Sequence, residues 1–185
     1  MRYNVIFVGT VGVGKTSLIC RYVNGVHNKT VSTTLAVDYV PMTIGDIELS
    51  LWDTAGQERF MSMTSSYFSR GHVFVLVHNI DSDQLQDLKV WYKQIFEKRP
   101  ARHEPVVIIV SNKTDLQPFC STKITEWVRE HSFEHVYTSA LSGEGIEPLF
   151  KRIHDAVIVH QTDWLSPSLP VLSHDVSKPT PGCNC

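Results

Sequence analysis

Short apolar runs alternate along this chain with segments in which apolar residues recur at helical spacing. The runs Val5–Val8, Val73–Val77 and Val106–Val110 have the length of β-strands, and their continuous hydrophobicity is typical of strands buried on both faces. A helix is predicted between the second and third runs, with these apolar residues on one face: Leu85, Leu88, Trp91, Tyr92, Ile95 and Phe96. This alternation predicts an α/β fold, in which helices cover both faces of a mostly parallel sheet.

One pair of strands is expected to depart from the parallel arrangement. Apolar and polar residues alternate between Val37 and Trp52, on either side of Gly45-Asp46, and this pattern predicts a β-hairpin. Pro41 lies in the first of these strands and has no backbone N–H to donate, so we expect that strand at an edge of the sheet. The whole pattern predicts a mostly parallel six-stranded sheet with one antiparallel edge strand.

The C-terminal part of the chain continues this pattern and then loses it. Helical spacing near Thr122–His131 and from Ile146 to Val157 flanks a short strand near Val136-Tyr137. From Thr162 onward, four prolines interrupt a stretch that has little periodicity. We therefore predict one folded domain over residues 1–161 and a flexible tail over residues 162–185.

The composition narrows the class of protein. A length of 185 residues suits one α/β domain with a short tail, and the net charge of −2 implies no broad basic surface for nucleic acid. The four cysteines have no disulfide spacing, no signal peptide precedes the first strand, and no apolar run is long enough to span a membrane. We expect an intracellular protein that reaches a membrane only through an anchor.

A phosphate-binding pattern follows the first apolar run. Residues 9–16, Gly-Thr-Val-Gly-Val-Gly-Lys-Thr, fit the P-loop pattern G-x-x-x-x-G-K-[ST] between a strand and an amphipathic helix. In such a loop the backbone N–H groups point at phosphate oxygens, and the helix N-terminus favours anions. We expect Lys15 to reach the β- and γ-phosphates and the hydroxyl of Thr16 to bind Mg²⁺.

Two more polar segments follow predicted strands. Asp53 ends the strand Leu49–Trp52, which is where an acidic residue supports the Mg²⁺ of a P-loop protein. Asn112-Lys113-Thr114-Asp115 directly follows the strand Val106–Val110. The carboxylate of Asp115 is able to accept both the N1–H and the 2-amino group of guanine, whereas adenine lacks these donors. The pair of segments predicts a site for a guanine nucleotide with Mg²⁺.

Together with Thr138-Ser139-Ala140, these motifs resemble the Ras-like small GTPases over roughly residues 3–160. Within that superfamily, the segment Trp52–Phe60 followed by Ser65-Ser66-Tyr67 is similar to the Rab family, as is the Cys-x-Cys of Cys183 and Cys185. The resemblance implies GTP and GDP with Mg²⁺ as ligands, and GTP hydrolysis in vesicle trafficking.

The resemblance also implies roles for individual residues. The nucleotide is expected at Gly12, Val13, Gly14, Lys15, Thr16, Ser17, His27, Thr34, Gly56, Asn112, Lys113, Asp115, Ser139, Ala140 and Leu141. Mg²⁺ is expected at Thr16, Thr34 and, through water, Asp53. Gln57 is implied to orient the attacking water, with Lys15 and Thr34 as the other catalytic residues. Effectors are expected at Tyr39, Trp52 and Tyr67, and two geranylgeranyl groups at Cys183 and Cys185.

The sequence departs from the family pattern at four positions. Val11 stands where efficient hydrolysers carry Gly, Ala or Ser, and its stiff β-branched side chain is expected to project toward the γ-phosphate and slow hydrolysis. His27 stands where a Phe or Tyr usually lies beside the guanine, which implies either faster nucleotide exchange or merely an exposed loop histidine. Leu35 and Ala36 replace the usual Ile and Gly, so the effectors are not identified.

The interpretation that combines these features is a monomeric Rab-type switch on the cytoplasmic face of intracellular membranes, with a soluble cytosolic pool. Its implied partners are effectors, an exchange factor, a GTPase-activating protein, and a dissociation inhibitor or escort protein. Two alternatives stay open. The first is a platform that remains bound to GTP because of Val11, and the second is a P-loop ATPase or nucleotide kinase, which the segment Asn112–Asp115 disfavours.

Overall fold

The predicted alternation of strands and helices is present in the folded chain. The computed structural model describes residues 1–26, 34, 37–56, 67–81, 83–98, 103–116 and 121–165. The elements follow in this order: β1 (Arg2–Val8), α1 (Lys15–Asn24), β2 (Val37–Ile44), β3 (Ile47–Thr54), β4 (Val73–Asn79), α3 (Leu85–Lys98), β5 (Val106–Asn112), α4 (Thr122–Glu130), β6 (Glu134–Thr138) and α5 (Ile146–Leu165). Each strand and helix expected from the apolar pattern has a counterpart among them.

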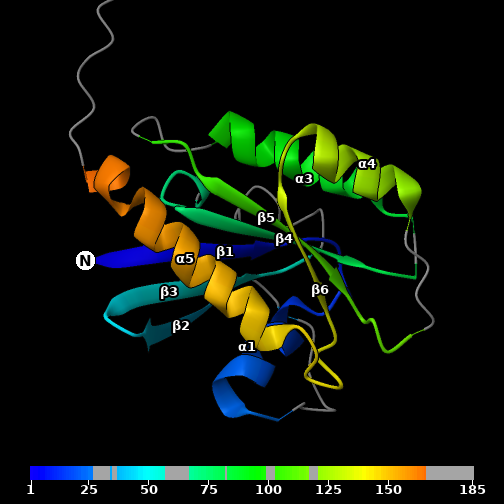
Figure 1. Cartoon of the computed structure of the whole chain (residues 1–185), viewed down its shortest axis with the longest axis horizontal. Coiled ribbons are helices and arrows are strands. Elements are labelled where there is room, and N and C mark those ends of the chain that lie inside the picture. The colour runs from blue at the N-terminus through cyan, green and yellow to red at the C-terminus, as the bar shows by residue number, and fades with distance from the viewer. Residues whose placement is uncertain are drawn as a thin grey trace, which may run out of the picture.

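The strands form one sheet in the order β2-β3-β1-β4-β5-β6 (Figure 1). β1 pairs in parallel with β3 and β4, and β5 pairs in parallel with β4 and β6. Only β2 runs antiparallel, against β3, and it is an edge strand in which Pro41 lies opposite Ser50. The prediction of an α/β fold with a mostly parallel six-stranded sheet and one antiparallel edge strand is confirmed.

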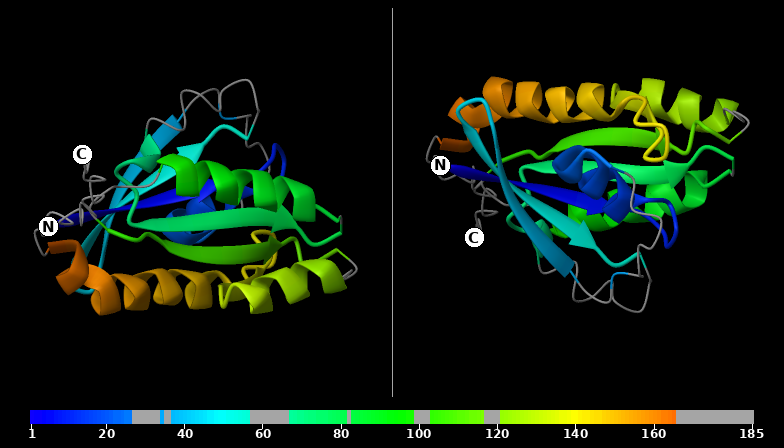
Figure 2. Two further views of the ribbon diagram at one scale, coloured as in Figure 1. Left: turned by 90° about the horizontal axis from the view of Figure 1, so that it is seen from above. Right: turned by 90° about the horizontal axis from the view of Figure 1, so that it is seen from below.

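Alternate residues of the central strands point to opposite faces of the sheet and build two separate cores. On β1, Val5 and Phe7 belong to the core under α1 and α5, whereas Ile6 and Val8 belong to the core under α3 and α4. In Figure 2 the strands form the middle of the molecule, with the helices packed outside them. Because both faces are covered, residues at successive positions of β1 are apolar, and the strand is a continuous hydrophobic run in the sequence.

The core under α1 and α5 is centred on Phe150. Its side chain is fully buried, and its ring stacks on that of Tyr22 with the centroids 3.7 Å apart and the planes 4° from parallel. The ring of Phe7 lies 6.2 Å away on β1. This aromatic group therefore joins two helices to the central strand of the sheet.

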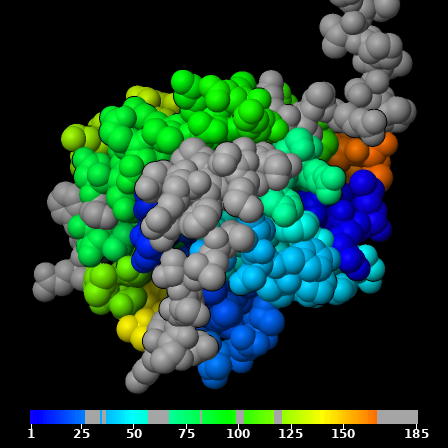
Figure 3. Space-filling model, turned by 180° about the vertical axis from the view of Figure 1, so that it is seen from behind, coloured from blue at the N-terminus to red at the C-terminus, as the bar shows by residue number. Residues whose placement is uncertain are grey.

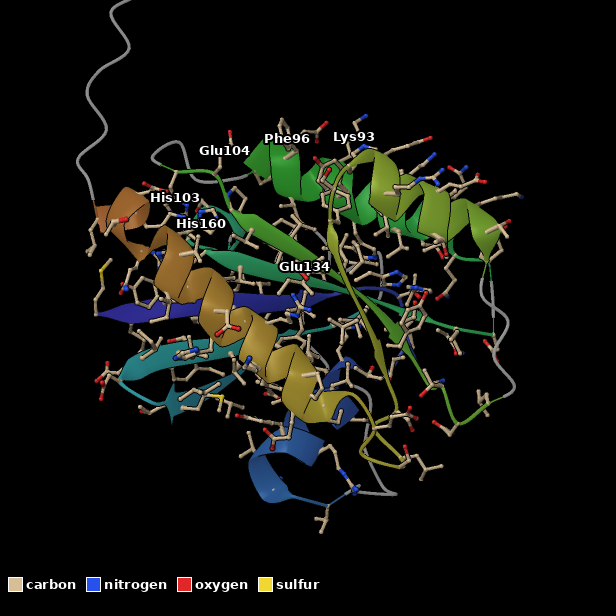
Figure 4. All side chains as sticks on the ribbon, in the orientation of Figure 1. Lys93, Phe96, His103, Glu104, Glu134 and His160 are labelled. Atoms are coloured by element: carbon tan, nitrogen blue, oxygen red, sulfur yellow. The ribbon has the colours of Figure 1, made fainter. Side chains whose placement is uncertain are left out.

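The predicted apolar face of α3 is only partly buried. Leu88, Trp91 and Ile95 are at most 3% exposed, but Phe96 is 49% exposed. Figure 4 shows Phe96 at the surface of α3, beside a pocket that Glu104 also lines. The sequence pattern places Phe96 on the apolar face of this helix with the residues expected in the core, and for Phe96 that interpretation is wrong. An α-helix turns about 100° per residue, so the position after Ile95 is rotated out of the buried stripe.

Helix α5 extends past the predicted end of the domain. It continues to Leu165, so the boundary expected at residue 161 falls inside the helix. The last turn is held by Trp164, whose ring lies 5.7 Å from that of Tyr3 and whose Nε1–H donates to the carbonyl of Glu104 (3.2 Å). Figure 3 shows the end of α5 (orange) and the start of β1 (dark blue) on the same side of the molecule. None of the described helices combines the length and the hydropathy that a membrane-spanning segment requires.

We expect Phe150→Ala to lower the free energy of unfolding by about 3–5 kcal/mol, because it removes a fully buried ring and leaves a cavity. Phe96→Ala is the matched control, and its loss should stay below about 1 kcal/mol because the ring is half exposed. Urea unfolding followed by tryptophan fluorescence measures both changes. Equal losses in the two variants would contradict this assignment of the core.

Candidate functional site

Four loops meet at one edge of the sheet because β1, β3, β5 and β6 all run in the same direction. The carboxyl ends of parallel strands lie together, so the residues that follow these strands are neighbours in space. The P-loop follows β1, Asp53 lies near the end of β3, Asn112 ends β5, and Ser139 follows β6. The three polar segments predicted separately from the sequence therefore converge on one site.

Lys15 is almost completely buried at the start of α1. Its side chain is 6% exposed, and its Nζ donates to the carbonyl oxygens of Gly9 (2.8 Å) and Thr10 (3.1 Å). Burial lowers the pKa of Lys15 to about 8, although the nearby carboxylate of Asp53 acts in the opposite direction. The N-cap residue of α1 is Gly14, which has no side chain to occupy the N–H groups of the first turn. These N–H groups and the ammonium form a surface suited to an anion.

Two glycines allow the backbone to come close to its neighbours in this site. Gly14 has φ +98°, and a Cβ added there would collide with the side-chain amide of Asn112. A Cβ added at Gly56 would lie 2.5 Å from backbone atoms of Thr10 and Val11. No side chain is accommodated at either position without a shift of the P-loop or of the segments packed against it.

A pocket of about 320 Å³ lies between the P-loop and these segments. Its lining consists of Val11, Gly12, Gly14, Lys15, Thr16, Ser17, Thr34, Thr54, Gly56 and Lys113. Most of the residues predicted to contact phosphate are thus brought together around one space. Val11 also lines the pocket and is 49% exposed. That its side chain projects toward the γ-phosphate stays a prediction.

Three oxygen-bearing side chains cluster beside Lys15. The hydroxyl of Thr16 donates to Asp53 Oδ2 (2.5 Å), Thr34 donates to the same oxygen (3.2 Å), and the two hydroxyls are 3.0 Å apart. Burial raises the pKa of Asp53, although the hydrogen bond from Thr16 and the charge of Lys15 oppose the rise. Asp53 Oδ1 is buried and has no hydrogen-bond partner among the described residues.

These oxygens fit the ligand preference of Mg²⁺, which takes hydroxyl, carboxylate and water oxygens in P-loop proteins. The unpaired Oδ1 of Asp53 is one such acceptor, since a buried carboxylate oxygen is stable only when a donor or a cation compensates it. Within the described part of the chain, no cluster of three or more His, Cys, Asp or Glu residues suggests a second metal site.

Asn112 connects the P-loop to the loops on the other side of the pocket. Its Nδ2 donates to the carbonyl of Val13 (2.8 Å), and its Oδ1 accepts from Thr138 Oγ1 (3.1 Å) and from the backbone N–H of Ala140 (3.3 Å). Its own carbonyl accepts from the N–H of Ile80 (3.0 Å). Asn112 is 1% exposed, and these hydrogen bonds pair its buried polar atoms. They join the P-loop, the end of β4 and the loop after β6.

Asp115 is oriented by the loop after β6. Ser139 Oγ donates to Asp115 Oδ1, and the same Oγ accepts from the backbone N–H of Ser142 (3.0 Å). Lys113 has φ +68°, a left-handed conformation that turns the chain sharply after β5. Asp115 and Ser139 are therefore in contact, and Leu141 is 53% exposed. The residues predicted at the nucleotide that do not line the pocket among the described ones are Val13, Asn112, Asp115, Ser139, Ala140 and Leu141.

Several predicted residues lie outside the described part of the chain: His27, Leu35, Ala36, Gln57, Cys183 and Cys185. Two contacts of the site were not expected. Arg21 on α1 donates to the carbonyl of Ser142 (3.1 Å), and Thr54 donates to the carbonyl of Phe7 (2.7 Å). The partners lie 121 and 47 positions apart, so no local pattern in the sequence indicates them.

Comparison with known protein families supplies the deciding observation, because the family model described as the Ras family matches residues 4–159. The chain belongs to the Ras family. It is therefore a small GTPase, a P-loop protein that binds GTP and GDP, typically with Mg²⁺, and hydrolyses GTP as a molecular switch. The match extends from β1 into α5 and includes every segment of the site described above.

We expect Asn112→Ala to weaken GDP binding at least about tenfold, because it removes three side-chain hydrogen bonds, each worth roughly 0.5–1.5 kcal/mol, that join the P-loop to the other loops. Titration with fluorescent GDP measures the change. Asn24→Ala, at the exposed end of α1, is the matched control and should bind like the unchanged chain. Equal binding by both variants would contradict the connecting role of Asn112.

Proposed function

We propose that this chain is a Rab-type GTPase, which recruits effectors to intracellular membranes in its GTP state and releases them after hydrolysis. The observation that carries the proposal is that Lys15, Thr16, Thr34 and Lys113 line one pocket. Asp53 bonds to both threonines, and Asp115, two residues after Lys113, is held by Ser139. A phosphate chain with Mg²⁺ and a guanine base need these two groups of residues at the same time.

The proposed nucleotide pose follows from the charges and donors of the site. The phosphates lie over the N–H groups of residues 12–17, with the Lys15 ammonium between the β- and γ-phosphates. An anion beside Lys15 stabilises its charged form and offsets the burial that lowers its pKa. The base lies over Lys113, with its N1–H and 2-amino group donating to Asp115 and the loop that begins with Ser139 and Ala140 beside it.

The proposed metal site uses the cluster of Thr16, Thr34 and Asp53. The two hydroxyl groups would hold the ion, and the Asp53 carboxylate would support it through a bound water. Mg²⁺ supplies neutralisation of the charge on the β- and γ-phosphate oxygens. The hydroxyl of Thr34 lies 3.2 Å from Asp53 Oδ2. Because the ion is expected beside Asp53 and binds the γ-phosphate, Thr34 is close to the position proposed for that phosphate.

Hydrolysis is proposed to depend on positioning rather than on covalent chemistry. Water attacks the γ-phosphorus, the bond to the bridging oxygen of GDP breaks, and phosphate leaves. The Gly56 N–H donates to the γ-phosphate, Gln57 orients the water, and Lys15 stabilises the charge that develops on the oxygens. Gly56 already lies against Thr10 and Val11, so its N–H is close to the P-loop.

Val11 is proposed to slow this step. Its half-exposed side chain lines the pocket together with Gly56 and Thr34. A displacement of the water or of the γ-phosphate that is worth about 1.4 kcal/mol lowers the rate tenfold. The same observation favours a second candidate function, a platform that stays bound to GTP and holds effectors without cycling.

The aromatic residues Tyr39, Trp52 and Tyr67 are proposed to contact effectors. The rings of Tyr39 and Trp52 lie 5.0 Å apart and those of Trp52 and Tyr67 lie 4.9 Å apart, so the three form one continuous patch. Tyr39 is 43% exposed. Rigid aromatic side chains at a surface supply much of the binding energy of protein interfaces.

Membrane attachment is proposed to use two geranylgeranyl groups on Cys183 and Cys185. One lipid chain holds a protein only marginally, and each buried CH₂ contributes roughly 0.8 kcal/mol, so two chains give stable binding. From residue 162 onward the sequence has one basic residue, Lys178, and two acidic residues, Asp163 and Asp175. Electrostatic attraction to anionic lipid therefore adds little to membrane binding.

The test of the switch is single-turnover hydrolysis of chain loaded with GTP, compared with Val11→Gly. We expect the substitution to speed phosphate release at least about tenfold, because it removes the side chain that displaces the reacting groups. A normal rate in the unchanged chain that does not rise in the variant would refute the role of Val11. Release too slow to measure from the unchanged chain, together with measurable release from Val11→Gly, would support the platform instead.

The test of attachment is vesicle flotation after treatment with a geranylgeranyl transferase system. The unchanged chain should float with neutral vesicles, the double variant Cys183→Ser/Cys185→Ser should stay in solution, and each single variant should bind weakly and reversibly. Flotation of the double variant would refute attachment through these cysteines. Cys20→Ser provides the control for a cysteine elsewhere in the chain.

A further inference from the structure

Gln84 connects helix α3 to the P-loop. Its Nε2 lies 3.1 Å from Thr10 Oγ1, and its Oε1 lies 2.9 Å from the backbone nitrogen of Asn79. A backbone N–H only donates, so Oε1 must face Asn79, and Nε2 is left to donate to the hydroxyl of Thr10. One side-chain amide thus joins the end of β4 to a residue of the P-loop that lies 74 positions away.

The position of Gln84 is set by the start of α3. Its carbonyl accepts the first helical bond, from the N–H of Leu88 (3.0 Å). The preceding residue, Asp83, bonds to Ser121 (3.3 Å) and Lys123 (3.3 Å) at the start of α4. Gln84 therefore projects from a point where two helices and the end of β4 meet.

Thr10 and Val11 lie between Gln84 and Gly56. On one side, the amide of Gln84 donates to the Thr10 hydroxyl. On the other, the Cα of Gly56 approaches so closely that a Cβ would lie 2.5 Å from the Thr10 carbonyl and the Val11 nitrogen. The Thr10 carbonyl also accepts from Lys15 Nζ (3.1 Å). A movement of Thr10 is thus expected to shift Gly56, Val11 and Lys15 together.

The groups that touch Thr10 and Val11 are the ones expected beside the γ-phosphate. Gly56 lines the pocket and lies against Thr10 and Val11, whereas Lys113, which also lines the pocket, is expected under the base in the pose proposed above. GDP has no γ-phosphate, so of the groups that move with Thr10 only Lys15 contacts it, through the β-phosphate. GDP therefore depends less than GTP on the position of Thr10.

We propose that Gln84 is a positioning residue for the γ-phosphate, which holds Thr10 and Val11 against Gly56 and so makes the site retain GTP rather than GDP. The inference rests on the proposed function of the site as a GTP switch. Gln84 acts through the hydroxyl of Thr10, and it contacts neither nucleotide nor metal in this arrangement.

The experiment measures the dissociation of a fluorescent non-hydrolysable GTP analogue and of fluorescent GDP from the full chain, with Mg²⁺ present. The variants are Gln84→Met, Thr10→Val and the two combined. Thr10→Val removes only the bond to Nε2 and leaves the bond to Asn79 intact, so it keeps the test valid if Gln84→Met folds poorly. Gln86→Ala, two positions later and exposed on the same helix, is the matched control.

We expect each single variant to speed dissociation of the GTP analogue about three- to tenfold, the range for loss of one hydrogen bond, and to leave GDP dissociation within about twofold. The double variant should dissociate no faster than Gln84→Met alone, because Thr10→Val removes only a contact that Gln84→Met has already removed. Gln86→Ala should match the unchanged chain.

The role of Gln84 would be overturned if both nucleotides dissociated equally faster, if the effects added in the double variant, or if Gln86→Ala showed the same change. Gln84 would then contribute to the stability of the fold and not to the retention of GTP. Unchanged dissociation in both single variants would overturn it as well. Failure of the proposed function has a different result, since the unchanged chain would then retain neither nucleotide.

Discussion

The parallel pairing of β1 with β3 on one side and with β4 on the other is the constraint on which the site depends. In this register Phe7 lies opposite Asp53, so the carboxylate is adjacent to the point where the P-loop leaves β1. The pairing of β5 with β6 likewise sets Asn112 opposite Thr138, to which it bonds. A shift of one residue in either pair would turn these polar side chains toward the opposite face and the wrong core.

Two buried ionisable groups, Lys15 and Asp53, determine which ligands the site at the carboxyl ends of the strands is able to bind. Lys15 and Asp53 are 6% and 2% exposed, and burial shifts the pKa of each toward its neutral form. Ionised groups in the interior are stable only when hydrogen bonds or opposite charges compensate them. Backbone carbonyls compensate Lys15 in part, and hydroxyl groups do so for Asp53, which leaves the site suited to a bound anion and a bound cation together.

Strand β3 links this site to the surface proposed for effectors. Successive residues of a strand face opposite sides of the sheet, so Trp52 and Asp53 belong to different faces. Asp53 bonds to the residues proposed to bind the metal, whereas Trp52 packs against the core of α3 and α4 and contacts Tyr39 and Tyr67. A change in the bonding of Asp53 therefore has a short path to the aromatic patch, along two adjacent residues of one strand.

The sequence by itself determined the features that depend on neighbouring residues. Apolar runs buried on both faces predicted the parallel strands, Pro41 predicted the edge strand, and the spacing of residues 9–16 predicted the P-loop, because backbone conformation and hydrophobic periodicity are local properties. Only the tertiary structure decided which distant groups meet. The bond of Gln84 to Thr10 and the bond of Trp164, in the last turn of α5, to Glu104 follow from strand register and helix packing. Such contacts join residues far apart in the chain, and no pattern within one segment encodes them.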